Sequence, residues 1–269
     1  MSATIIIVTL LIILGTALGS LLSVIIHRIE HQEKGIIIGR SRCPHCRKTL
    51  ASADLVPIFS YIYLRGKCRY CNKKISPMYF FLEITSALVL ILIYLKFPFA
   101  GTPGAASYFF DTAMALKFSL YAINSILLIG IFFHDLQYSK IPDIFIWPFV
   151  IVSLANNIAN KSSSFPDLLI ACAIALVFFG GQRLLSKGNW LGEGDVYVSI
   201  GMALLFGWKL FIVAIVLTYL AGGIIGFALL AMRKVEQKSK IPFAPFMVFG
   251  TFATILYGQE ILNWYANIL

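Results

Sequence analysis

Two acidic residues stand at the edges of apolar segments, where the hydrocarbon of a membrane would begin. Asp135 follows the apolar run 118–133, and Asp195 ends the sequence Gly192-Glu193-Gly194-Asp195 just before another run. A carboxylate at such a depth is costly, which indicates a function. Two carboxylates that share one proton can act as a base toward water and as an acid toward an amide. This is the chemistry of an aspartyl protease.

Neighbouring acids and structural roles compete with this interpretation. Asp143 falls at the expected first turn of a helix, where the helix dipole is sufficient to explain an acid. Asp195 is equally suited to capping the helix that follows it, and Glu83 lies within an apolar run without an obvious partner. Gly192 and Gly194 favour a function for Asp195, because glycines allow a substrate backbone to come close and allow positive φ angles beside the acid.

Two Cys-x-x-Cys pairs form a second candidate site. Cys43 and Cys46 are separated from Cys68 and Cys71 by a spacer of 21 residues, close to the spacing of a four-thiolate zinc site. A tetrahedral shell of four thiolates has no open position, so this zinc would be structural. Two disulfides or a redox pair are the alternative, and a segment in the reducing cytoplasm disfavours them.

The composition indicates an all-α, polytopic membrane protein. Hydrophobic residues make up 59% of the 269 residues and charged residues only 13%, which is not typical of a soluble domain. The net charge of +10 does not predict a nucleic-acid partner, because the basic residues flank apolar runs instead of forming stripes. About eight transmembrane helices are expected from the apolar runs, at residues 4–26, 78–95, 116–133, 144–160, 167–185, 196–207, 210–232 and 244–262.

The distribution of Lys and Arg predicts the orientation. Residues 4–26 have no Lys or Arg before them and are followed by His27 and Arg28, which favours a retained helix with an external N-terminus over a cleaved signal peptide. Alternation then places the polar residues 27–77 and both aspartates at the cytoplasmic side, provided that the short run 196–207 crosses. Basic residues agree with this orientation, with Lys140, Arg183, Lys187, Arg233, Lys234, Lys238 and Lys240 inside and Lys96, Lys117, Lys161 and Lys209 outside.

Three domains are therefore expected. Residues 1–26 form the first transmembrane helix, residues 27–77 a cytoplasmic zinc-knuckle domain, and residues 78–269 a seven-helix membrane protease domain. A polar region of about 50 residues buries little core, so a metal would stabilise it.

Together these segments resemble the type IV prepilin peptidase family, the bifunctional leader peptidases and N-methyltransferases of bacterial pilus and type II secretion systems. The resemblance extends over almost the whole chain. It is carried by Gly19-Ser20, His27-Arg28, Ser41-Arg42-Cys43-Pro44-His45-Cys46, Asp54-Leu55-Val56-Pro57-Ile58-Phe59-Ser60-Tyr61, Leu64-Arg65-Gly66-Lys67-Cys68-Arg69-Tyr70-Cys71, Ile75-Ser76, Glu83, the stretch from Asp135 to Asp143, Gly192-Glu193-Gly194-Asp195 and Ile241-Pro242-Phe243-Ala244-Pro245-Phe246.

The resemblance implies a function and site residues. Asp135 and Asp195 match the family's catalytic pair, and the four cysteines match its zinc site. The implied reaction is cleavage of the basic leader of a prepilin or pseudopilin after glycine at the bacterial inner membrane. Methylation of the new N-terminus by S-adenosylmethionine follows, although no glycine-rich fingerprint locates that cofactor.

Departures from the family pattern are modest. Ala244 stands where the family often has glycine. Val196 and Tyr197 stand where the family commonly has a lysine after its Gly-x-Gly-Asp motif. Two other classes of protein remain open from the residues alone. One is a transporter that uses Asp135, Asp195 and Glu83 as a proton relay, and the other is a zinc-knuckle scaffold whose acids only cap helices.

Overall fold

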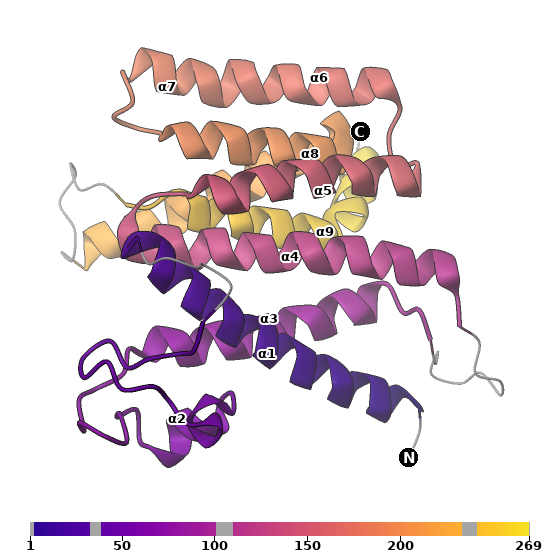
Figure 1. Ribbon diagram of the computed structural model, residues 1–269. Coiled ribbons are helices and arrows are strands. Elements are labelled where there is room, and N and C mark those ends of the chain that lie inside the picture. The colour runs from indigo at the N-terminus through magenta and orange to yellow at the C-terminus, as the bar shows by residue number, and fades with distance from the viewer. Residues whose placement is uncertain (1–2, 33–38, 101–109, 233–240, 269) are drawn as a thin grey trace. The chain divides into compact units, whose positions relative to one another are not determined.

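The computed structural model describes residues 3–32, 39–100, 110–232 and 241–268, which form helices joined by short turns (Figure 1). The expected basic segment 233–240 and much of the expected external connection at 97–111 lie outside the described residues. Contacts divide the chain into two units, Met1–Ala115 and Leu116–Leu269. The three-domain division made from the sequence stays a prediction.

In the first unit, two long helices cross at close range. They are α1 (Ala3–Glu30) and α3 (Pro77–Lys96). A Cβ atom on Gly15 would lie 2.5 Å from the Cα of Ala87, and one on Gly19 would lie 2.6 Å from the carbonyl oxygen of Leu82. Small residues of this kind let the backbones of membrane helices approach each other. The two glycines therefore set how closely α1 and α3 pack.

The segment between these helices contains only short elements. They are a 3₁₀ turn, Ser52–Leu55, and the helix α2, Phe59–Tyr63. The side chain of Asp54 is almost fully buried, and it accepts a hydrogen bond from Arg69 Nε at 2.7 Å. This ion pair ties the 3₁₀ turn to the second cysteine pair.

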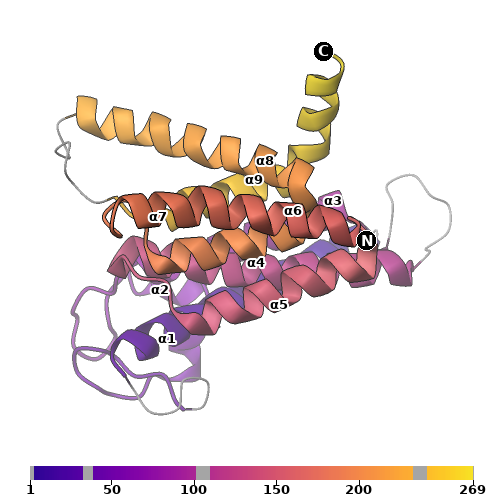
Figure 2. The ribbon, with the colours of Figure 1, turned by 90° about the horizontal axis from the view of Figure 1, so that it is seen from above.

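The second unit is a bundle of helices around α8. It contains most of α4 (Thr112–Tyr138) and all of α5 (Asp143–Asn160), α6 (Phe165–Ala175), α7 (Gly181–Leu185), α8 (Glu193–Ala231) and α9 (Ala244–Ala266). Helix α8 packs against α5, α6 and α9. The C-terminal end of α4 and the N-terminal ends of α5, α8 and α9 lie at the same end of this unit (Figures 1 and 2). Residues at these four helix ends can therefore meet.

Helix α8 consists of two helices joined at Gly207, whose φ of 68° and ψ of 172° are not helical. The chain reverses direction there (Figure 2). Backbone carbonyls that lose helical partners at this turn accept other donors, since Asn157 Nδ2 donates to Leu205 at 3.4 Å and Ser163 Oγ donates to Phe206 at 3.3 Å. Glycine is required because only glycine adopts this backbone conformation without strain.

The prediction of an all-α membrane protein with about eight helices is confirmed. Each of the eight apolar runs is helical in the described residues, including 196–207, which forms most of the first half of α8. Six helices of the described chain are long and apolar enough to cross a membrane when the two halves of α8 are taken as one. The protein is therefore a multi-pass membrane protein.

Candidate active site and candidate metal centre

Asp195 lies in the first turn of α8, where 7% of its surface is exposed. Its Oδ2 accepts a hydrogen bond from the backbone N–H of Gly192 at 2.8 Å. Gly192 is the N-cap residue and Asp195 is the third residue of the helix. The alternative interpretation, in which Asp195 is the N-cap residue, is wrong about its position, although its carboxylate does satisfy a backbone donor at the helix start.

Asp135 lies in the last turn of α4, and only 5% of its surface is exposed. Its Oδ2 accepts a hydrogen bond from the backbone N–H of Ala244 at 3.1 Å. Ala244 is the first residue of α9, so Asp135 satisfies a donor at the start of a helix that is distant in sequence. Each aspartate therefore uses one carboxylate oxygen at a helix N-terminus, in a position that favours a negative charge.

The turn after α4 rests directly on the start of α8. A Cβ atom on Gly194 would lie 2.9 Å from the Cβ of Ile141, and the rings of Trp147 and Tyr197 are 5.5 Å apart between centroids. The structure thus brings the segment that carries Asp135 to the segment that carries Asp195.

The two glycines beside Asp195 act differently from the expectation. Gly192 has a φ of −75°, and neither glycine adopts a positive φ, so that part of the prediction is wrong. Gly194 is needed for a close approach, but the group that approaches it is Ile141 of the same chain. Gly192 is less constrained, because a Cβ there would meet only Asp195 Oδ2 at 3.4 Å.

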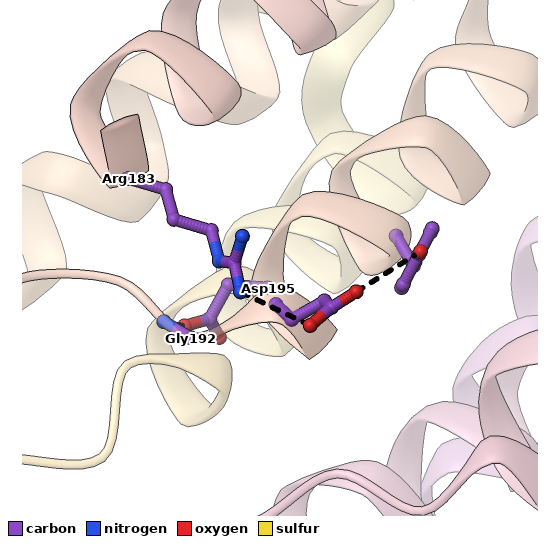
Figure 3. A network of polar contacts seen from close by, with 5 residues as sticks. Arg183, Gly192 and Asp195 are labelled. Carbon is purple, nitrogen blue, oxygen red and sulfur yellow. Dashed lines mark hydrogen bonds and ion pairs between the residues drawn. The ribbon is translucent and has the colours of Figure 1, made fainter. Parts of the chain in front are cut away.

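A polar network on the surface lies beside Asp195 (Figure 3). Arg183 of α7 forms an ion pair with Glu193 at 3.0 Å, and the hydroxyl of Tyr197 donates to Glu193 Oε1 at 3.3 Å. The side chain of Glu193 is 62% exposed, as expected for a solvated residue. The network links α7 to the Gly192 turn without involving the buried carboxylate.

The two competing acids have other surroundings. Asp143 is exposed at the first residue of α5, in agreement with a dipole role. Glu83 of α3 is buried and accepts a hydrogen bond from the backbone N–H of Ile58 at 2.7 Å, so the expectation that it lacks an obvious partner is wrong. Ile58 has a φ of 64°, a conformation that is strained for a β-branched residue. Glu83 therefore holds a strained turn at the start of α2.

The four cysteine sulfurs lie together in the first unit. Cys43, Cys46, Cys68 and Cys71 are free thiols, and their sulfurs all lie within 4.8 Å of one another. The sulfurs of Cys43 and Cys71 are 3.9 Å apart. This is close to the separation of about 3.8 Å between two sulfurs that bind one zinc ion tetrahedrally. Cys43 and Cys68 are buried and the other two are half-buried. This donor set fits a metal ion.

Both cysteine pairs sit in the same kind of turn. The backbone N–H of Cys43 donates to Lys48 at 3.0 Å, Arg47 donates back to Cys43 at 2.9 Å, and Arg47 has a φ of 56°. The turn at residues 68–73 repeats these bonds at 2.9 and 3.0 Å, with a φ of 54° at Asn72. Each turn directs two sulfurs toward one point.

The thiol of Cys71 favours its protonated form when no cation is present. The backbone N–H of Lys73 lowers the pKa of the Cys71 thiol, but burial and hydrogen bonds from Cys68, Cys46 and Cys43 together raise that pKa to about 11. A metal ion that binds Cys71 must therefore displace its proton.

Sequence reasoning missed several residues around the aspartates. The donor role of Ala244 and the packing of Ile141 on Gly194 involve residues that the family resemblance included but to which it gave no role. The predicted start of a helix at residue 244 was a usable signal for free backbone donors, but it did not indicate which acid would accept from them.

The fold and the two sites define a class of protein, a multi-pass helical membrane protein with two buried aspartates at helix ends. Two family models match the chain in order. The Bacterial Peptidase A24 N-terminal domain matches residues 13–97, and the Type IV leader peptidase family matches residues 122–227. The two matches together cover more than half of the chain, so it belongs to the type IV leader peptidase family, as its resemblance predicted.

Curated relatives support this membership over nearly the full length. The "Prepilin leader peptidase/N-methyltransferase" of Bacillus subtilis (strain 168) is 28% identical over 97% of this chain and 98% of its own. The proteins of the same name from Legionella pneumophila and Aeromonas hydrophila are 27% and 25% identical, over 93% and 96% of this chain and 91% and 93% of their own. No solved structure matches the chain.

Proposed function

We propose that this protein is a bifunctional prepilin leader peptidase. It cleaves the basic leader of type IV prepilins or pseudopilins after a glycine, and it methylates the new N-terminal residue. Family membership and the names of the relatives support both activities. The observation that carries the protease half is the placement of Asp135 and Asp195, which are buried and lie on segments that pack together at one end of the second unit.

Asp135 and Asp195 are the catalytic pair in this proposal, and they hold one proton between them. The ionised carboxylate takes a proton from a water molecule, whose oxygen then attacks the carbonyl carbon of the scissile amide. The protonated carboxyl group gives its proton to the carbonyl oxygen. When the resulting gem-diol collapses, the C–N bond breaks, the leaving nitrogen takes the proton that came from water, and one diol hydroxyl gives its proton back to the ionised carboxylate.

The hydrogen bonds to the two aspartates are compatible with their proposed roles as general base and general acid. In both residues the recorded backbone donor engages Oδ2, which leaves Oδ1 to face the water and the amide. The backbone donors keep both carboxylates in place during proton transfer. Gly192 and Gly194 support the loop, since Gly194 allows Ile141 to pack beside Asp195.

The four cysteines hold a structural Zn²⁺ in this proposal. Four thiolates with tetrahedral spacing favour zinc and leave no position for a substrate, so the metal stabilises the segment between α1 and α3. S-adenosylmethionine is the methyl donor proposed for the second activity, which rests on the relatives' names. In this proposal the enzyme lies in the bacterial inner membrane, as its family implies, and the distribution of Lys and Arg supports a cytoplasmic position for the cysteines and aspartates.

Cleavage of a purified prepilin tests the protease proposal. The wild type, Asp135→Ala and Asp195→Ala are compared in detergent or nanodiscs, and Asp143→Ala serves as a matched control from the exposed start of α5. Wild type and control should release the leader, whereas the two other variants should not. Equal processing by all four proteins would defeat the assignment of the pair.

Two rival interpretations both predict that the wild type cleaves no prepilin in this assay. A transporter would process no prepilin, and the relatives reported above are named as peptidases and not as transporters. A scaffold whose acids only cap helices would also process none.

Methylation of a precleaved substrate by the Asp135→Ala variant, followed with a labelled methyl donor, shows whether the two activities use separate sites.

A further inference from the structure

An apolar groove with a volume of about 890 Å³ follows one face of α6, the π-helical turn Leu176–Gly180 and α7. Ile170, Ile174, Phe178, Gly181 and Leu185 recur along it at intervals of three or four residues, which is the spacing of one helix face. Residues 170–185 span roughly 22 Å at the helical rise. The groove is therefore elongated and suits a rod-like apolar ligand better than a compact one.

Gly181 helps to form the hollow. A Cβ atom built on Gly181 meets nothing within 4 Å, although its backbone is helical. Glycine at this position is not required by backbone conformation or by a neighbour inside the protein. The π-helical turn directly before it is a rare element that is frequent at functional sites. Both features are consistent with a surface shaped to receive a second helix.

One end of the groove lies near the aspartate site. Trp190 lines the groove and lies two residues before Gly192, the hydrogen-bond donor to Asp195. Tyr219 also lines the groove, and its hydroxyl donates to Gln182 Oε1 at 2.9 Å. The ring of Tyr219 lies 5.4 Å from that of Phe243, which precedes the donor to Asp135. The groove thus ends near the two backbone donors that hold the aspartates.

We propose that this groove binds the apolar helix of the prepilin substrate, with the scissile bond at the Trp190 end beside Asp195. The inference rests on the proposed function, because the resemblance to the prepilin peptidase family implies a substrate whose apolar helix follows the cleaved bond. The length of the groove covers much of the roughly 30 Å of membrane hydrocarbon. Helices in lipid associate through close packing. The hollow at Gly181, which has no side chain, would let a second helix approach closely.

Photo-crosslinking tests the position of the substrate helix directly. A photo-reactive amino acid is placed at Val177, which lines the groove and is 76% exposed, or at Phe227, which lies on the second half of α8 and is 74% exposed. Both positions are introduced into Asp195→Asn, so that intact prepilin accumulates. Prepilin should crosslink at position 177 and at least roughly tenfold less at position 227. Equal yields, or crosslinks to lipid alone at position 177, would overturn the docking proposal.

Kinetics with a filled groove provide a second test. Gly181→Leu places a side chain in the groove, and Gly226→Leu is the matched control, since a Cβ there also meets nothing within 4 Å. Full-length prepilin is compared with a peptide that spans the scissile bond but lacks the apolar stem. Gly181→Leu should lower kcat/KM for prepilin roughly tenfold or more, mainly through KM, as expected for a disturbed apolar pocket. Cleavage of the peptide should not change.

The outcomes separate the two proposals. Wild-type protein that cleaves neither substrate would contradict the proposed protease function, and crosslinking would still show where the prepilin helix binds. Wild-type cleavage combined with unchanged prepilin kinetics in Gly181→Leu would contradict the docking groove alone. Gly226→Leu with the same defect as Gly181→Leu would also contradict it, because the effect would then not be specific to the groove.

Discussion

The cysteine cluster and the aspartate pair reach their geometry by different routes. Two short turns of the same kind arrange the four thiols, and each turn is closed by hydrogen bonds within six residues. The aspartates instead depend on α4, α8 and α9 and on the packing of Ile141 on Gly194. Local sequence thus shapes the metal centre, whereas packing between distant segments shapes the proposed catalytic site. Damage to the two regions should therefore have different consequences.

The largest effect is expected for isosteric changes of the aspartates. In Asp135→Asn and Asp195→Asn, the amide oxygen can still accept the N–H of Ala244 or Gly192. Prepilin cleavage should fall at least about 10³-fold, within the range for lost acid–base catalysis, while the thermal unfolding midpoint stays near that of the wild type. A strongly lowered midpoint would indicate that the acids mainly cap helices.

Removal of one thiolate should change metal content and local structure, in contrast to the isosteric changes of the aspartates. Cys68 is 2% exposed and belongs to the four-sulfur cluster, so Cys68→Ser should lower the bound zinc from about one per chain to nearly none. The segment between α1 and α3 should then become sensitive to protease. Cys172→Ser, which lies outside the cluster, should keep its zinc. A wild type that contains no metal when purified without chelator would refute the zinc proposal.

The two glycines beside Asp195 allow a finer comparison. Gly194→Ala places a methyl group 2.9 Å from the Cβ of Ile141, so the turn after Asp135 must shift. A displacement of catalytic groups by about 1 Å can cost up to roughly 10²-fold in rate, and we expect about a tenfold loss of kcat. Gly192→Ala should lose less, since its nearest contact is 3.4 Å away. The reverse order in steady-state assays would argue against the Ile141 contact.

A smaller effect is expected at Glu83. Glu83→Ala removes the acceptor of the Ile58 N–H and should cost roughly 1–3 kcal/mol of local stability. Glu83→Gln keeps an acceptor oxygen and should cost less. Limited proteolysis near α2, with intact mass as the readout, measures this difference. Equal protection of both variants and the wild type would show that Glu83 does not hold the strained turn.

Much of the fold was predictable from the sequence, because apolar runs in a membrane must form helices to satisfy their backbone groups. The run 196–207 illustrates the limit of this argument. Its length indicated a short helix, but the reversal at Gly207 depends on donors from Asn157 and Ser163. Those residues are distant in sequence, and periodicity carries no information about them.

The four cysteines were predictable as one cluster, since their spacing and local turns are sufficient to bring the thiols together. The amino-acid sequence by itself also determined the apolar helices and the presence of acids at their ends. Only the tertiary structure decided that Asp135 accepts from Ala244, that Ile141 takes the space left by Gly194, and that Glu83 supports Ile58. The physical reason is that local hydrogen bonds and hydrophobicity act over a few residues, whereas these contacts form only when separate helices pack together.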